Sequence, residues 1–189
     1  MSELRTKFKL RRRQLSMAEM TTASNAICER LLSHISTNII DNIALYFSSE
    51  NEPDITRLLS ELEFRNCQLF APKSTPNPNE PYSVAPIGGP YGFTMQPGRF
   101  GIAEPVSPPL PLNDAKTRVE CWLVPGIAFT RSGARIGQGR GFYDRLLANA
   151  PGLKIGIAYD WQLVPTLKQL PHDVRMDFIA TPSELIRCH

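Results

Sequence analysis

A glycine-rich segment near the middle of the C-terminal half carries the strongest chemical signal in this chain. Three glycines alternate with single polar residues in the order Gly137, Gln138, Gly139, Arg140 and Gly141. Alternating glycines permit backbone conformations that other residues avoid, so several successive N–H groups can point at one anion. Arg135 and Arg140 add guanidinium groups, whose planar forks suit phosphate oxygens. The segment therefore predicts a polyphosphate-binding loop.

This loop matches neither of the two common nucleotide-binding motifs. The chain lacks the GxxxxGK[ST] pattern of a P-loop, and GQGRG is GxGxG instead of the GxGxxG of dinucleotide-binding folds. Glycine alternation alone is a weak signal. The two arginines, and a position between an expected strand and an expected helix, strengthen the prediction.

The elements that must position this loop follow from the hydrophobic pattern. Short apolar runs predict strands over 42–47, 67–71, 119–124, 154–158 and 177–181. Helices are expected to begin at the Ser16–Glu19 capping box, after Asp54, and near Phe142. The last of these would place helical N–H groups and a positive dipole end beside the loop. Strands that alternate with helices indicate an α/β fold with a mainly parallel sheet.

Residues 72–111 interrupt this alternation, because they hold 11 of the 17 prolines. Such a density of proline excludes a long helix or a central strand. Two interpretations remain open: a surface excursion with short edge strands, or a loop that faces a substrate.

Composition sets the remaining limits. The chain has 189 residues, a length that predicts a single domain over 1–189. Its net charge of +3 gives no independent reason to expect binding to nucleic acid. Long apolar stretches and a secretory signal are lacking, so we expect a cytoplasmic protein that does not enter a membrane. The four cysteines form no CxxC or CxxH pair, which argues against zinc and a redox dithiol.

Beyond these patterns, the segment VPGIAFTRSGARIGQGRGFYDRLL resembles the signature of the 5-formyltetrahydrofolate cyclo-ligase family. Four further blocks resemble that family in the same order along the chain: RRRQLS at 11–16, YFSSENE at 46–52, FGIAEP at 100–105 and HDVRMDFIAT at 172–181. The five blocks together extend over nearly the whole sequence.

The resemblance implies a three-layer α/β fold similar to those of sugar-phosphate isomerases and CoA transferases. It also implies a reaction, in which 5-formyltetrahydrofolate and MgATP give 5,10-methenyltetrahydrofolate, ADP and phosphate through a phosphorylated formyl (imidate) intermediate. The expected partners are ATP and the folate, with or without a polyglutamate tail, and the expected state is a monomer.

Family positions assign roles to individual residues of this chain. The resemblance implies ATP binding by Arg5, Arg135, Gly137, Gln138, Gly139, Arg140, Gly141, Phe142 and Tyr143. It implies folate contacts from Phe47, Glu52, Gln138, Gly139, Arg140, Gly141 and Phe142, with Tyr91 and Phe93 as further aromatic candidates. Arg140 and Tyr143 are expected to be catalytic, and Asp144 and Asp177 are expected to bind Mg²⁺.

Two departures leave questions open. Thr130 stands where the family has aspartate. An alternative interpretation therefore remains open, in which the chain is a degenerate relative that binds folate or nucleotide without turnover. At the N-terminus, counting back from Ser16 selects Arg5 as the ATP-binding arginine, whereas the KxxLR match over 7–11 would select Arg11.

A basic anion-binding module that uses residues 5–13 is the other alternative, although it would leave the glycine loop unexplained.

Overall fold

A seven-stranded sheet forms the centre of the protein, in the order β11-β10-β9-β6-β1-β2-β3. The computed structural model describes residues 2–98, 103–139 and 141–189. The sheet comprises β1 (Asn42–Ala44), β2 (Gln68–Ser74), β3 (Tyr82–Ile87), β6 (Cys121–Pro125), β9 (Leu153–Ile157), β10 (Phe178–Ala180) and β11 (Leu185–Arg187). The five strands from β10 to β2 are parallel, and β3 and β11 are antiparallel edges. The predicted α/β class with a mainly parallel sheet is confirmed.

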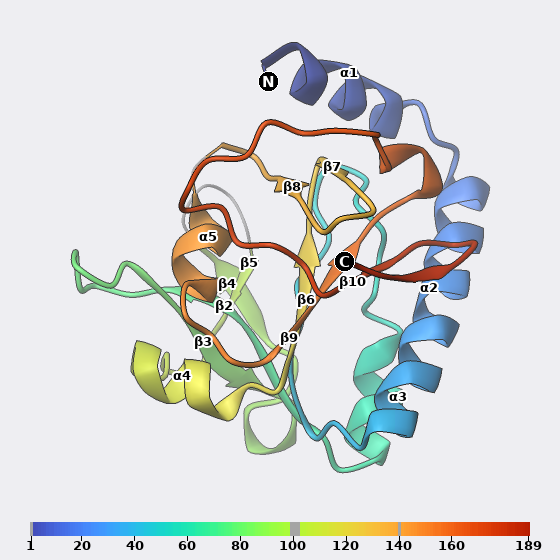
Figure 1. Cartoon of the computed structure of the whole chain (residues 1–189). Coiled ribbons are helices and arrows are strands. Elements are labelled where there is room, and N and C mark those ends of the chain that lie inside the picture. The colour runs from blue at the N-terminus through green and yellow to red at the C-terminus, as the bar shows by residue number, and fades with distance from the viewer. Residues whose placement is uncertain (1, 99–102, 140) are drawn as a thin grey trace.

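Helices cover both faces of this sheet, which gives three layers (Figure 1). On one face α2 (Met17–Asn38) and α3 (Leu58–Phe64) pack on side chains such as Ile43 and Leu123. On the other face α4 (Leu112–Arg118) and α5 (Phe142–Leu147) pack on the alternate side chains, including Trp122. Because both faces are covered, the central strands read as continuous apolar runs in the sequence.

The proline-rich region forms short strands at the sheet margin, as one of the two interpretations expected. β3 is the edge strand and includes Pro86, and it is followed by η1 (Gly89–Tyr91). A separate hairpin pairs β4 (Met95–Pro97) with β5 (Ala103–Pro105). The described part of the family-like block 100–105 begins at Ala103. An edge location suits proline, which cannot donate to a neighbouring strand.

The helix starts were predicted with mixed success. The Ser16–Glu19 capping box is present, with Glu19 N donating to Ser16 Oγ at 3.2 Å and Ser16 N donating to Glu19 Oε2 at 2.8 Å. The expectation that Asp54 caps the next helix is wrong, because its Oδ1 accepts from Thr56 N within a turn and α3 begins only at Leu58.

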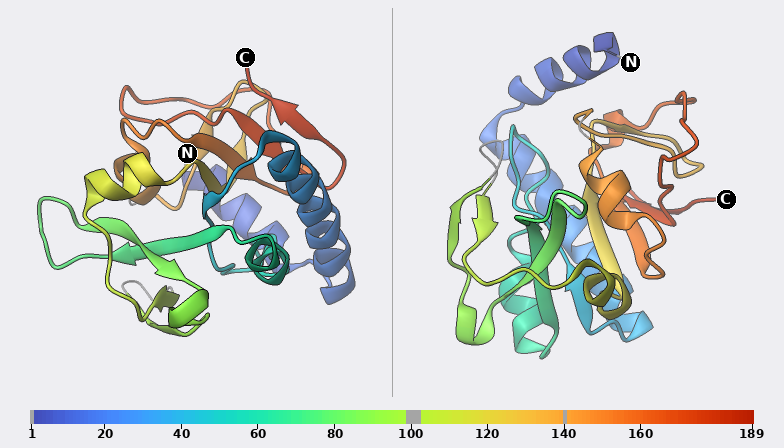
Figure 2. Two further views of the ribbon diagram at one scale, coloured as in Figure 1. Left: turned by 90° about the horizontal axis from the view of Figure 1, so that it is seen from below. Right: turned by 90° about the vertical axis from the view of Figure 1, so that its left-hand side faces the viewer.

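Helix α1 (Ser2–Arg13) lies beyond the end of the sheet, on the side to which the parallel strands point (Figures 1 and 2). Phe8 attaches it to Ile127, Ala128 and Ile136, which belong to the segment that contains the small hairpin of β7 (Ala128–Phe129) and β8 (Arg135–Ile136). Phe8 also stacks on Trp161 at 5.5 Å, in the 3-10 turn η3 (Asp160–Gln162). In the described residues, every helix is too short or too polar to cross a membrane.

Candidate active site

A cavity of about 470 Å³ opens at the carboxyl edge of the sheet. Its walls come from the residues after β1, the residues after β6, the glycine loop, the start of α5, and α1. Open α/β sheets place ligands at this edge, where loops after neighbouring strands converge. The volume lies within the ordinary range for small-molecule sites.

Most of the residues singled out in the sequence meet in this one cavity. Its lining includes Arg5, Phe47, Glu52, Arg135, Gly137, Gln138, Gly139, Gly141, Phe142, Tyr143 and Asp144. Arg140, expected to be catalytic, lies outside the described residues. Tyr91 and Phe93 are absent from the described lining, and Tyr82 of β3 supplies an aromatic wall instead, 4.3 Å from the ring of Phe142.

The glycine loop lies close to the guanidinium group of Arg5, and a side chain at Gly139 would crowd it. Gly139 has φ of 95°, and a Cβ there would lie 3.3 Å from the guanidinium carbon of Arg5. Gly141 has φ of 63° and begins α5. Because α5 has only six residues, its dipole is small, and we assign anion attraction to the arginines and the loop rather than to the helix.

Arg5 enters the cavity from α1 and donates from Nε to the carbonyl oxygen of Gly137 at 3.0 Å. Arg11 instead lies over the ring of Trp161, 4.6 Å from its centroid. Of the two possible N-terminal alignments, the structure therefore brings the residue selected by counting, Arg5, to the glycine loop. Lys9 also lines the cavity and was missed, although its i+4 spacing from Arg5 places both on one helix face.

Arg135 and Asp144 form a largely buried ion pair in the cavity wall. Arg135 Nη2 donates to Asp144 Oδ1 at 3.0 Å, and the guanidinium lies over the ring of Tyr143, 5.5 Å from its centroid. Burial raises the pKa of the Tyr143 phenol well above its usual value, so this hydroxyl stays protonated. The Tyr143 hydroxyl can therefore donate a hydrogen bond to a ligand.

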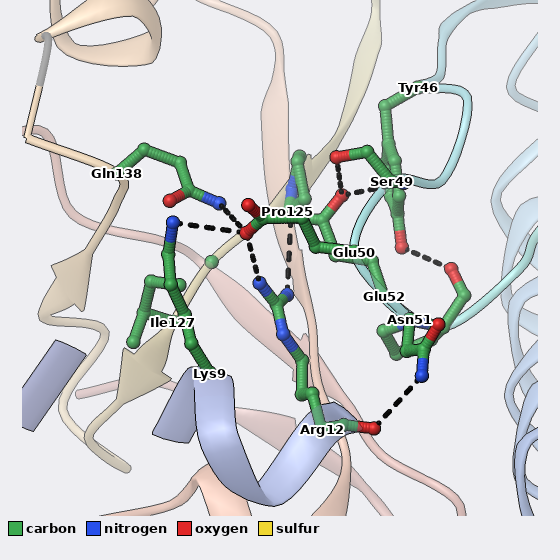
Figure 3. Close-up of polar contacts among 12 residues, drawn as sticks. Lys9, Arg12, Tyr46, Ser49, Glu50, Asn51, Glu52, Pro125, Ile127 and Gln138 are labelled. Atoms are coloured by element: carbon green, nitrogen blue, oxygen red, sulfur yellow. Dashed lines mark hydrogen bonds and ion pairs between the residues drawn. The ribbon is translucent and has the colours of Figure 1, made fainter. Parts of the chain in front are cut away.

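The folate side of the expected site is centred on Glu52, which is 8% exposed. Its Oε2 accepts from the N–H and the hydroxyl of Ser49, each at 3.2 Å, and its Oε1 lies 3.2 Å from Arg12 Nη1 (Figure 3). Burial raises the pKa of Glu52, and the charge of Arg12 and the Ser49 hydrogen bonds oppose that rise. Arg12 was missed because basic residues in a run are usually exposed.

Asp177 is not brought to the cavity with Asp144. It directly precedes β10, whose parallel neighbour is β9, and its Oδ2 accepts from Lys154 N near the beginning of β9 at 2.8 Å. This is the amino edge of the sheet, opposite the cavity. The expectation that the two aspartates share one ion is thus corrected: of these two residues, Asp144 lines the site and Asp177 does not.

Whether the residues present suit Mg²⁺ depends on the remaining carboxylates. The described residues contain no group of three or more side chains able to hold a metal. Arg135 Nη2 and Val174 N both approach Oδ1 of Asp144, and within the described chain Oδ2 has no recorded partner. One carboxylate fits an ion held mainly by phosphate oxygens and water, which is how Mg²⁺ usually binds nucleotides. Asp173 and the exposed His172, which lie 4.0 Å apart, also line the cavity.

Thr130, which the resemblance marked as a departure, has a structural role. Its hydroxyl accepts from Ala134 N at 3.1 Å and lies 2.9 Å from Ser132 Oγ. It thereby closes the turn that leads into β8. Thr130 does not belong to the described cavity lining.

Comparison with known proteins agrees with this geometry. A model of the 5-formyltetrahydrofolate cyclo-ligase family matches residues 1–182. The chain belongs to this family. A 5-formyltetrahydrofolate cyclo-ligase of Haemophilus influenzae is 30% identical over 91% of this chain and 92% of its own. The corresponding protein of Escherichia coli strain K12 is 27% identical over 93% of this chain and 96% of its own.

A solved structure extends the family relationship to the fold. The 5,10-methenyltetrahydrofolate synthetase of Aquifex aeolicus superposes with a TM-score of 0.81 and 33% identity, over 98% of this chain and 91% of its own. This cyclo-ligase family member is therefore a ligase of folate metabolism, built on the fold of its structural relatives.

Proposed function

We propose that this cyclo-ligase family member converts 5-formyltetrahydrofolate and ATP to 5,10-methenyltetrahydrofolate, ADP and phosphate. The observation that carries the proposal is that cationic Arg5 and Lys9, the glycine loop and the Glu52 carboxylate all line one cavity. A phosphate chain and a pterin can therefore lie side by side in it, as phosphoryl transfer between them requires.

The ends of the cavity differ in chemistry, and this orients the two substrates. We place the phosphates at the glycine loop, where Arg5 and Lys9 supply positive charge and Arg140 belongs by sequence. We place the pterin against Phe47, with its amino-pyrimidinone edge donating to Glu52. Lys9 connects the two ends, because its Nζ lies 3.0 Å from Oε2 of Glu50, two residues before Glu52.

The proposed reaction begins when the formyl oxygen attacks the γ-phosphorus and the bond to ADP breaks. The amide oxygen becomes part of a phosphate leaving group. N10 of the folate then attacks the activated carbon, loses its proton, and phosphate departs with the former formyl oxygen. These steps need alignment and charge neutralisation more than a protein nucleophile. Asp144 would hold Mg²⁺, whose role when bound is to neutralise charge on the phosphates.

The finer properties of the protein follow from the same assignment. We propose that the enzyme works as a monomer in the cytoplasm and accepts folate with or without a polyglutamate tail. All four cysteines are unpaired, which suits a reducing compartment.

The absorbance of methenyltetrahydrofolate tests the proposal directly. Purified protein is mixed with 5-formyltetrahydrofolate with and without MgATP, and the nucleotide products are separated. Product should form only with MgATP, with one ADP per turnover. AMP and pyrophosphate would overturn the phosphoryl-transfer route. Binding of folate without product would instead identify the degenerate relative.

A further inference from the structure

Arg12 is a fully buried cation that does not belong to the described cavity lining. Its side chain is 0% exposed, near the end of α1. Nη1 lies 3.2 Å from Glu52 Oε1 and Nη2 lies 3.5 Å from Glu50 Oε2. Within the described part of the chain, none of its three guanidinium nitrogens has a partner at hydrogen-bonding geometry. The two carboxylates therefore balance its charge through ion pairs, and Figure 3 shows the guanidinium directed at both of them.

A buried guanidinium without full hydrogen bonding is costly, so its position calls for a physical reason. Arg13, the next residue, carries the same charge in an exposed position. What distinguishes Arg12 is its contact with Glu52, the carboxylate at the folate end. Ser49 occupies Oε2 of Glu52 with two hydrogen bonds, whereas Oε1 has Arg12 beside it. A carboxylate oxygen has two acceptor positions, so Oε1 can accept from both Arg12 and a ligand.

The backbone keeps this arrangement in register. Glu50 and Asn51 have left-handed backbone conformations, with φ of 48° and 57°. Asn51 Nδ2 donates to the carbonyl oxygen of Arg12 at 3.1 Å, and Tyr159 Oη donates to the carbonyl oxygen of Asn51 at 3.2 Å. The turn that carries Glu52 is thereby fixed to the end of α1.

We propose that Arg12 is a positioning residue for folate, which acts from behind the cavity wall by orienting Oε1 of Glu52 and keeping that carboxylate ionised. The proposal rests on the proposed function, because it takes Glu52 as the acceptor for the pterin edge. It assigns to the N-terminal helix a second role, on the folate side, besides the contribution of Arg5 to the phosphate side.

The groups around Glu52 explain why one cation matters so much there. Tyr46, Tyr143 and Tyr159 interact with it, and burial raises the pKa of each phenol, to about 12 for Tyr159. They are neutral at ordinary pH. The Glu50 carboxylate also faces Arg12 and pairs with Lys9, and the Asp54 carboxylate acts on Tyr46. Burial raises the pKa of Glu52, and Arg12 is the largest opposing influence. Without Arg12, the pKa of Glu52 should rise further, and the protonated carboxyl group accepts hydrogen bonds more weakly than the carboxylate.

The test measures the dissociation constant of 5-formyltetrahydrofolate by calorimetry, without nucleotide, between about pH 6 and about pH 9. The variants are Arg12→Met, Arg12→Lys, Glu52→Gln, the double variant of Arg12→Met with Glu52→Gln, and Arg13→Met. Arg13→Met is the matched control, since it removes the same charge from an exposed position one residue away. Thermal unfolding shows which variants are folded.

The wild type and Arg13→Met should bind equally at each pH. Arg12→Met should bind at least about tenfold more weakly at the low end of this range, and the loss relative to the wild type should shrink as pH rises and Glu52 ionises. Arg12→Lys keeps the charge, so it should bind between the two and retain the pH profile of the wild type. The double variant should bind no more weakly than Glu52→Gln alone, because the carboxylate that Arg12 orients toward folate is already absent.

Two results would overturn the role of Arg12: an affinity loss equal at every pH, or a double variant far weaker than Glu52→Gln. If Arg12→Met does not fold, Arg12→Lys and the double variant still decide, since the double variant leaves no unpaired charge at this position. In that case, an affinity of Arg12→Lys for folate equal to that of the wild type would overturn the proposed role of Arg12. A wild type that does not bind folate would instead refute the proposed function.

Discussion

Arg5 donates from Nε to the carbonyl oxygen of Gly137 at 3.0 Å, although 132 residues separate the two in the chain. The bond joins the N-terminal helix to the glycine loop and makes the helix a wall of the site. It uses Nε, and Arg5 itself lines the cavity. Gly139 has no Cβ and so allows the guanidinium to approach the loop.

This contact predicts different effects for two arginines of one helix. Arg5→Ala should raise the KM for ATP by at least about tenfold, because it removes a cation and releases the loop. Arg11→Ala removes the same charge but only a contact with Trp161, and should change the KM for ATP little. Steady-state kinetics with ATP varied at saturating folate compares them. The reverse order of effects would support the KxxLR alignment over 7–11.

Asp144→Asn should lower turnover far more than stability. Asparagine keeps an oxygen that can accept from Arg135, and the loss of a helix-terminal charge costs only about 0.3–1 kcal/mol. A lost metal ligand should cost orders of magnitude in rate. Asp177→Asn, at the opposite sheet edge, is the control and should leave turnover near that of the wild type. Turnover within about tenfold of wild type for Asp144→Asn, roughly 1.4 kcal/mol of barrier, would exclude the metal role.

Arg140→Ala should lower kcat strongly and weaken ATP binding modestly. Arg140 stands between two glycines, and we expect it to offset charge on the γ-phosphate as that group moves to the formyl oxygen. Arg140→Lys should restore only part of the rate, because a point charge does not reproduce a planar fork. A raised KM for ATP with intact kcat would make Arg140 a ground-state binder, and unchanged kinetics would make it a solvated loop residue.

Gly133→Ala should destabilise the fold by about 2–4 kcal/mol. Gly133 has φ of 86°, and a Cβ there would overlap the carbonyl oxygen of Met176. Gly89 also has positive φ, 51°, but a Cβ there would meet no atom within 4 Å. Gly89→Ala should therefore cost only the backbone strain, about 1–2 kcal/mol. Denaturant unfolding of both variants separates strain from overlap, and equal losses would show that the overlap is relieved at little cost.

The sequence by itself determined the five parallel strands of the sheet, the helix starts at Ser16 and Phe142, and most residues of the candidate site. Apolar runs, the Ser16–Glu19 capping box and the proline density are local patterns, and local patterns reflect backbone preferences that hold in any fold. The glycine alternation also indicated phosphate chemistry. The start of α3 was misjudged because an aspartate side chain can close a turn as readily as it caps a helix.

Only the tertiary structure decided which distant residues meet. It brought Arg5 rather than Arg11 to the glycine loop, and it separated Asp177 from Asp144 by placing them at opposite edges of the sheet. It also buried Arg12 against Glu52, where the sequence shows only a basic run. Contacts of this kind depend on how strands are ordered and how helices cross them. Desolvation, which gives a buried charge its strength, arises only once those elements pack together.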